Sequence, residues 1–251
     1  ATGTGSVRAR GVASSNTLGK NDGDTVAEGE VFIGRTVATA TNARVIGSYN
    51  VAVLSKIASI TNGGAAAGTV PSGVADVGAF TFTAAANSNS KDGLNQATIS
   101  GAIFTVQATN VSLTYDGFKI YNKLAGSTQA AACTTWTTAG VAYTTSNVGS
   151  GTFLVRCDRL VTGNVVNTAI DQGSSITLVL QANVTDPNEA AGAGGSSLLQ
   201  VSLNDFSNVT KKTFASSSSR IEWQDKDSVE DQLFNWIEYP DSAVVSTKYE
   251  G

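Results

Sequence analysis

The chain has 251 residues, of which 41% are hydrophobic and only 14% are charged, and its formal net charge is −4. This apolar content with so small a net charge excludes an intrinsically disordered chain, and the acidic balance disfavours nucleic acid as a partner. The sequence has no histidine, which excludes Ser-His-Asp triads, Cys-His pairs and HExxH zinc sites.

The start of the chain, Ala1-Thr2-Gly3, and the lack of methionine indicate that a segment has been removed from the front. Small residues of this kind suit a signal-peptide cleavage site, although a trimmed recombinant chain would begin in the same way. No apolar run approaches the roughly 20 residues that a membrane-spanning helix needs. We therefore predict a secreted protein, extracellular or on the cell surface, without a membrane span.

Residues 1–24 are predicted to form an extended N-terminal arm. Their composition is rich in Gly, Ser and Thr, and residues 1–20 contain Arg8, Arg10 and Lys20 but no acid. Weak alternation suggests that the arm could add a strand to a neighbouring subunit's sheet. The alternative is a terminus that frays or docks on its own subunit. The residues expected in the subunit contact are Val7, Arg8, Ala9, Arg10, Gly11, Val12 and Ala13.

Residues 25–219 are predicted to form the body, because period-two alternation of apolar and polar residues keeps returning there. Phe80 and Phe82 alternate with threonines, and Phe104 and Val106 repeat the pattern with an inward phase. Short strands separated by Gly-, Asn- and Pro-containing turns predict an all-β, antiparallel β-sandwich, jelly-roll or immunoglobulin-like, with roughly 8 to 10 strands. Strands are expected within residues 31–39, 44–60, 79–84, 103–108, 111–115, 118–122, 151–161, 176–183, 199–204 and 220–223.

The two cysteines, Cys133 and Cys157, are predicted to form a disulfide. Phe153, Val155 and Cys157 alternate onto one strand face, which we expect to face the core. A bridge would close a loop of about 25 residues and stabilise the fold by about 3 kcal/mol. The alternative is two buried free thiols. Two thiolates without an imidazole do not favour a zinc site, so no metal or cofactor is predicted.

Residues 220–251 are predicted to form an acidic, aromatic C-terminal segment that packs on the body or on a neighbour. Eight acids stand against three bases there, a net charge of −5 opposite in sign to the arm, and such complementary ends suit head-to-tail association. Residues 227–236 could form one turn of helix. The aromatic residues are predicted in the core or in a subunit contact, with stacking on a sugar as the alternative: Trp223, Phe234, Trp236 and Tyr239.

Three Asn-X-Ser/Thr sequons make Asn110, Asn183 and Asn208 candidate glycosylation sites. They apply if export follows a glycosylating route, which would place these side chains on the exposed surface. Glycans are therefore candidate partners, beside other copies of the chain.

Two stretches carry a resemblance: residues 78–124, with Phe-Thr-Phe-Thr-Ala and Phe-Lys-Ile-Tyr-Asn, and residues 220–251, with Ile-Glu-Trp and Phe-Asn-Trp-Ile-Glu-Tyr-Pro-Asp-Ser. They are similar to segments of uncharacterised secreted β-sandwich surface proteins of uncultivated bacteria. The resemblance covers about a third of the chain and implies a surface location, without any catalytic or binding residue. In architecture the chain also resembles pilus-like subunits that polymerise by donor-strand exchange.

The function predicted from these features is that of a structural subunit of an extracellular cell-surface polymer, a pilus-like filament or a surface layer. It would assemble head-to-tail from identical copies and have no enzymatic activity. The alternative is a carbohydrate-binding or adhesive module. A glycosidase needs only two carboxylates, but nothing in the sequence selects a pair.

Overall fold

The structure is a computed structural model that describes residues 57–86, 96–144, 147–158, 160, 166–188, 195–203, 221–225, 233–234 and 243–251. The chain divides into two units, Ala1–Ala52 and Val53–Gly251, and all described residues belong to the second. The predicted arm and the predicted strand at residues 31–39 lie outside the described residues. Across the described ranges, no helix is long and apolar enough to cross a membrane.

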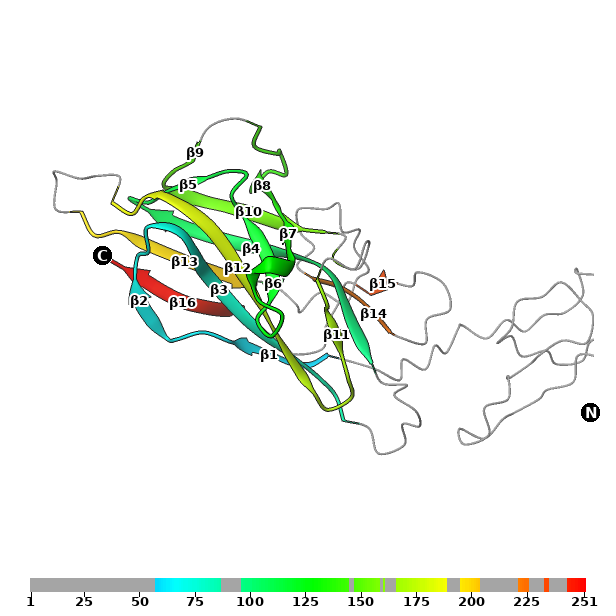
Figure 1. Ribbon diagram of the computed structural model, residues 1–251. Coiled ribbons are helices and arrows are strands. Elements are labelled where there is room, and N and C mark those ends of the chain that lie inside the picture. The colour runs from blue at the N-terminus through cyan, green and yellow to red at the C-terminus, as the bar shows by residue number, and fades with distance from the viewer. Residues whose placement is uncertain are drawn as a thin grey trace, which may run out of the picture. The chain divides into compact units, whose positions relative to one another are not determined.

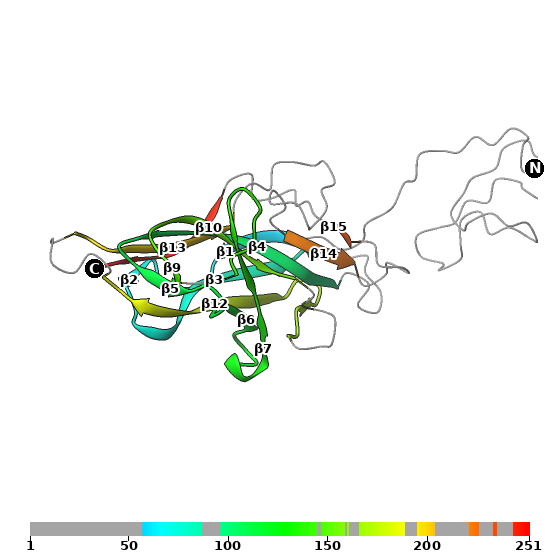
Figure 2. The same cartoon turned by 90° about the horizontal axis from the view of Figure 1, so that it is seen from above.

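The protein is an all-β sandwich of two sheets, as the alternation predicted (Figures 1 and 2). The first sheet has seven strands in the order β1-β3-β12-β5-β9, with β6 and β7 continuing from β12. Its strands are β1 (Ile57–Asn62), β3 (Gly73–Ala84), β5 (Ser112–Thr114), β6 (Lys119–Asn122), β7 (Ala130–Ala132), β9 (Asn147–Val148) and β12 (Ser175–Asp186).

The second sheet has nine strands in the order β15-β14-β4-β13-β16-β2, with β10 and β11 also paired to β4 and β8 paired to β10. Its strands are β2 (Ala67–Thr69), β4 (Ala97–Thr109), β8 (Thr134–Thr137), β10 (Gly151–Cys157), β11 (Ala169–Ile170), β13 (Leu198–Leu203), β14 (Ile221–Asp225), β15 (Leu233–Phe234) and β16 (Val244–Glu250). A 3-10 turn, η1 (Ser127–Gln129), links β6 to β7.

Two details differ from the predicted antiparallel sandwich. The described residues contain 16 strands rather than the expected 8 to 10, because several strands have only two to four residues and leave no visible alternation. One pair, β16 with β2, is parallel, because β2 belongs to a connection that closes the side of the sandwich and is not a hairpin partner.

The core lies between the two sheets and contains the residues whose inward phase was predicted. Phe80, Phe82 and Phe104 are fully buried, and the rings of Phe80 and Phe104 lie 5.3 Å apart across the sheet interface. Gly78 also faces the opposite sheet, where an added Cβ would lie 3.0 Å from the Cβ of Val201. The sheets are therefore in close contact at this point.

One side of the sandwich is closed by a stretch of chain that passes from the first sheet to the second. Residues 57–62 form β1, beside β3, and residues 67–69 form β2, beside β16. Asn62 shapes the crossing: its Nδ2 donates to the carbonyl of Ala65 at 3.1 Å, and its Oδ1 accepts from the Gly64 N–H at 2.9 Å. Short side chains of this type commonly shape turns by bonding to nearby backbone.

The opposite side is closed in the same way by residues 130–137, and the disulfide lies at this crossing. Residues 130–132 form β7, beside β6, and residues 134–137 form β8, beside β10. Between them, the Cys133 N–H donates to the Phe118 carbonyl at 2.9 Å, while its sulfur bonds to Cys157. The predicted disulfide is confirmed, and Cys157 is fully buried, as its phase indicated.

Three strands of the C-terminal segment, β14, β15 and β16, are part of the second sheet. β14 pairs with β4, and β16 pairs with β13 and β2. The expected helical turn is wrong at Leu233–Phe234, which form β15 beside β14. Pairing with a neighbouring strand, which no local pattern reveals, decides the conformation there.

Breaking the disulfide should destabilise the protein by about 3 kcal/mol, because a closed loop of this length restricts the unfolded chain. The measurement is urea unfolding of the oxidised protein, the reduced protein and the double variant Cys133→Ala/Cys157→Ala. Reduction should lower the midpoint of the wild type and leave that of the double variant unchanged. Equal midpoints for oxidised and reduced wild type would contradict this expectation.

Candidate functional site

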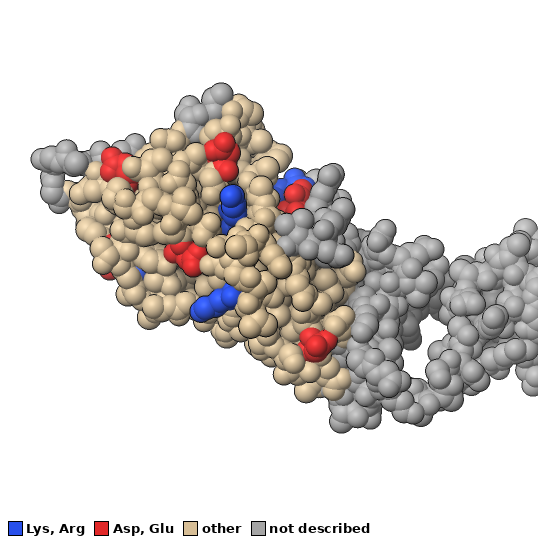
Figure 3. All heavy atoms as spheres, viewed as in Figure 1, with Lys and Arg blue, Asp and Glu red and all other residues tan. Residues whose placement is uncertain are grey.

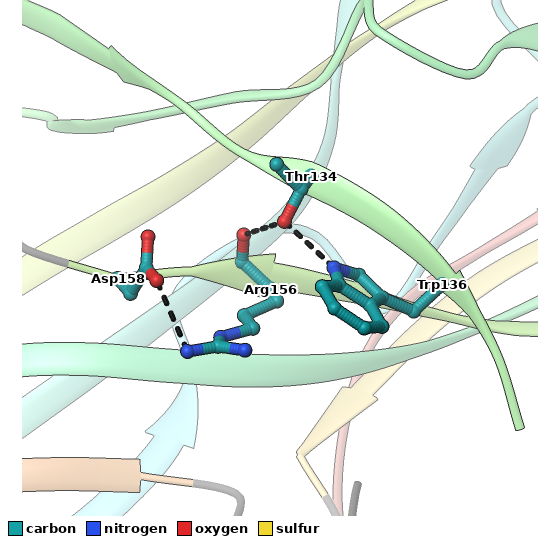
Figure 4. Close-up of polar contacts among 4 residues, drawn as sticks. All are labelled: Thr134, Trp136, Arg156 and Asp158. Atoms are coloured by element: carbon teal, nitrogen blue, oxygen red, sulfur yellow. Dashed lines mark hydrogen bonds and ion pairs between the residues drawn. The ribbon is translucent and has the colours of Figure 1, made fainter. Parts of the chain in front are cut away.

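A polar cluster on the outer face of the nine-stranded sheet is the strongest candidate site in the described part of the chain. It contains Thr134 and Trp136 from β8, Arg156 from β10 and Asp158 just beyond it (Figure 4). Alternation explains the grouping: Cys157 and its inward neighbours face the core, so Arg156 faces outward. Antiparallel pairing of β8 with β10 then places Thr134 directly opposite Arg156.

The Arg156 side chain lies between Trp136 and Asp158, as Figure 4 shows. Its guanidinium carbon is 5.5 Å from the centre of the Trp136 ring, and its Nη2 is 3.1 Å from the Asp158 carboxylate. A guanidinium over an indole face is a favourable cation–π arrangement. The Arg156 side chain is only 19% exposed, so the cation is held in a defined position.

Thr134 fixes the tryptophan ring. The Trp136 indole N–H donates to the Thr134 hydroxyl at 2.8 Å, and that hydroxyl donates to the Arg156 carbonyl at 3.4 Å. The ring is thus tied to the strand that carries the arginine. This arrangement presents an aromatic ring, a cation and a carboxylate side by side on rigid strands.

Glu222 of β14 lies close enough to this cluster for the charges of Arg156 and Asp158 to affect its pKa. Burial raises the pKa of the Glu222 carboxyl; the positive charge of Arg156 opposes this effect, and the negative charge of Asp158 adds to it. The charges of one arginine and two carboxylates therefore act together there. The carboxylates can accept hydrogen bonds from the hydroxyl groups of a ligand, and the guanidinium can donate hydrogen bonds to its oxygen atoms, as in other polar ligand sites. In the described ranges, no group of three or more His, Cys, Asp or Glu residues could hold a metal ion.

A second polar group lies on the first sheet, around Asp76 of β3. The Tyr121 hydroxyl donates to the Asp76 carboxylate at 2.8 Å, and Gln181 donates to the same carboxylate at 3.4 Å. Burial, together with the bond to and charge of Asp76, raises the pKa of Tyr121 to about 12. The Tyr249 hydroxyl, from the other sheet, donates to the Asp76 carbonyl at 2.9 Å. This group therefore links strands and sheets, which is a structural role.

The structure places only some of the predicted site residues. The predicted arm contacts, Val7 to Ala13, lie outside the described residues, as do Trp236, Tyr239 and Asn208. Trp223 is 2% exposed and packs in the core. Phe234 lies in β15, opposite Trp223. The aromatic residues predicted in the C-terminal segment therefore include one core residue.

Two sequon asparagines already use their amide groups. Asn110 donates its Nδ2 to the Ser196 carbonyl at 3.2 Å, and Asn183 donates its Nδ2 to the Thr114 hydroxyl at 3.1 Å. Attachment of a glycan replaces one of the two hydrogens on the nitrogen and leaves the other to donate, so these bonds do not exclude a glycan. Glycosylation of these residues stays a prediction.

The sequence does not by itself mark Thr134, Trp136, Arg156 and Asp158 as a site. The available signal was alternation, which places Thr134 and Trp136 on one face of a short segment and Arg156 opposite the inward phase of Cys157. Alternation shows which side chains share a face of each segment. It does not show that the two segments, about 20 residues apart in the chain, pair with each other. Only the register of β8 against β10 brings them together.

Comparisons with known proteins add no functional information. No protein-family model and no curated protein sequence matches the chain. Among solved structures, it is similar to the one described as "AvmM Catalyzes Macrocyclization in Alchivemycin A Biosynthesis", with 7% identity and a TM-score of 0.25, over 76% of this chain and 84% of that chain. A likeness at that score carries no argument about this protein.

Replacing Glu222 by Gln should stabilise the fold near neutral pH. A raised pKa means that the folded state favours the protonated carboxyl, so this preference stabilises the fold below the unfolded pKa and is lost as pH rises through the folded value. The neutral amide avoids the cost of burying a charge at pH 7. Thermal unfolding at pH 7 and pH 3 measures the effect, which should vanish at pH 3. A Glu222→Gln variant that is less stable at pH 7 would show that attraction to Arg156 outweighs burial.

Proposed function

We propose that the protein is a structural subunit of an extracellular cell-surface polymer, built head-to-tail from identical copies. The observation that carries the proposal is the sparse charge of the sandwich surface. On the face seen in Figure 3, acidic and basic side chains are few, and most of them are separated by large areas of other residues. In a head-to-tail contact two different faces of the chain meet, and faces with few charges can meet without burying unpaired charges.

The outer face of the first sheet supports this interpretation in detail. Hydroxyl and amide side chains on neighbouring strands bond to one another: Thr81 with Thr177 at 2.8 Å, Thr83 with Ser175 at 2.8 Å, Asn183 with Thr114 at 3.1 Å and Asn147 with Thr185 at 3.3 Å. These short side chains have little conformational freedom to lose on contact, unlike lysine or glutamate. A face of this kind can pack against a neighbour with a small entropic cost.

The buried disulfide supports the extracellular part of the proposal. Disulfides persist in oxidising compartments such as the cell exterior and are rare in reducing ones. Cys133 and Cys157 are 5% and 0% exposed. The disulfide is therefore buried within the fold and is shielded from exchange with other thiols. The proposal assigns the protein no enzymatic activity.

The arm is the proposed link between subunits. Its bases, Arg8 and Arg10, contrast with the acidic C-terminal segment, and complementary charges on two ends set the orientation of successive copies. The arm would act by strand addition, in which main-chain hydrogen bonds supply most of the affinity.

Deleting residues 1–15 should leave a folded, disulfide-bonded monomer and abolish polymers seen by negative-stain microscopy. A milder test is Val7→Asp/Ala9→Asp, which would place unpaired charges in the contact and should also prevent assembly. Thr2→Asp/Thr4→Asp is the matched control, with the same added charge outside residues 7–13. Normal polymers from the truncated protein would show that the arm is not the link.

The alternative is a carbohydrate-binding module, and one observation favours it. Trp136, Arg156 and Asp158 place an aromatic ring beside hydrogen-bonding groups on the outside of the sheet, and such groups together can hold a sugar by stacking and hydrogen bonds. Under this alternative, microscopy would show separate particles rather than polymers.

If this alternative holds, Trp136→Ala should weaken the binding of an oligosaccharide identified on a glycan array roughly two- to tenfold, the range expected for an aromatic contact. Val74→Ala is the control, because Val74 is 69% exposed on the other sheet. Isothermal titration of both variants measures the difference. Equal affinities for the two variants would remove the cluster as a sugar site.

A further inference from the structure

The side of the sandwich where β1 and β16 run close together has an edge that is only partly paired (Figure 1). β16 has β13 along one side for most of its length. On its other side, β2 pairs only with Lys248, Tyr249 and Glu250. The first part of β16, Val244 to Ser246, thus has no strand of the described residues beside it there.

An irregularity in β16 marks the end of the paired part. The register of β13 with β16 shifts between Gln200 and Ser202, so two residues of β16, Ser246 and Thr247, lie opposite one residue of β13 and form a bulge. Both are buried, at 2% and 4% exposure. Bulges bend and twist a strand. β2 begins beside Lys248, where the crossing from β1 reaches β16.

The two bulge residues differ in their hydrogen bonds. The Thr247 hydroxyl donates to the Ala65 carbonyl in the crossing between β1 and β2 at 2.7 Å. The Ser246 hydroxyl oxygen is buried and, among the described residues, has no hydrogen-bond partner. A buried polar atom without a partner costs free energy that a partner would recover. The structure therefore has both an incompletely paired strand and an unsatisfied hydroxyl at one place.

The core beneath this edge is already closed. Ile57 and Ile60 of β1 are 2% and 3% exposed, so an added strand would not have to replace a missing core strand. It would instead extend the sheet through main-chain bonds. Val245, 49% exposed, offers an apolar contact beside those bonds.

We propose that the Val244–Ser246 edge of β16 accepts the arm of another copy of this chain, residues 7–13. This inference rests on the proposed function and names the surface through which it works. The occupant is argued from the length of the chain: 56 residues precede Ile57, and the stretch from Ala13 to Ile57 spans up to roughly 145 Å when extended. That length lets an arm reach a neighbouring copy. Ala9, Gly11 and Ala13 have small side chains or none, so a strand formed by them needs little room beside β16.

The test is disulfide trapping between copies. One preparation carries Ala9→Cys and a second carries Val245→Cys; they are mixed, assembled and oxidised, and the linked peptides are identified by mass spectrometry. The control replaces the second preparation by Val74→Cys, which is also exposed but lies on β3 of the other sheet. The cross-link to position 245 should be at least tenfold more abundant than that to position 74.

The outcomes separate this inference from the function on which it rests. Normal polymers without a preferred cross-link to position 245 would overturn the acceptor edge and leave the structural role standing. An Ala9→Cys/Val245→Cys double variant that cross-links within one monomer would show self-docking and overturn the contact between copies. A protein that forms no polymer under any condition would overturn the proposed function and this inference with it.

Discussion

The crossing of the chain from one sheet to the other at Cys133 is the constraint on which the described structure depends most. Strands β7 and β8 are consecutive in sequence but belong to different sheets, and Cys133 lies between them. Its N–H bonds to Phe118, next to β6 in the first sheet, while its sulfur is joined to Cys157 in the second. The disulfide therefore fixes the distance between the layers at one side, and it also sets β8 against β10. The Trp136–Arg156 contact follows from that register.

The other side of the sandwich uses hydrogen bonds for the same task. There the chain crosses through Asn62 and the glycines that follow, and Thr247 bonds to the crossing. Hydrogen bonds tolerate more variation in the distance between two strands than a covalent bridge does. The incomplete pairing of β16 lies on this hydrogen-bonded side of the sandwich. One side is thus closed by a covalent bond, and the other has an edge that the described strands pair only in part.

A surface with few charges and many hydroxyl groups is compatible with assembly and with sugar binding. The two proposed functions place the contact on different surfaces. In the assembly proposal the contacts are the sparsely charged face around Thr81 and Thr177 and the β16 edge. In the sugar-binding alternative the contact is the outer face of the second sheet around Trp136. Because these surfaces lie on different parts of the fold, substitutions can affect one without altering the other.

The sequence by itself determined the all-β class, the inward phase of residues such as Phe80, Phe104 and Cys157, and hence the disulfide, because alternation is a local property that burial imposes on each strand. Only the tertiary structure decided the rest: which strands are neighbours, where the chain crosses between sheets, and where a bulge such as that at Ser246 interrupts pairing. The physical reason is that strand pairing joins residues far apart in the chain. The position of a short strand such as β8, and with it the contact of Trp136 with Arg156, depends on a register that no local sequence pattern contains.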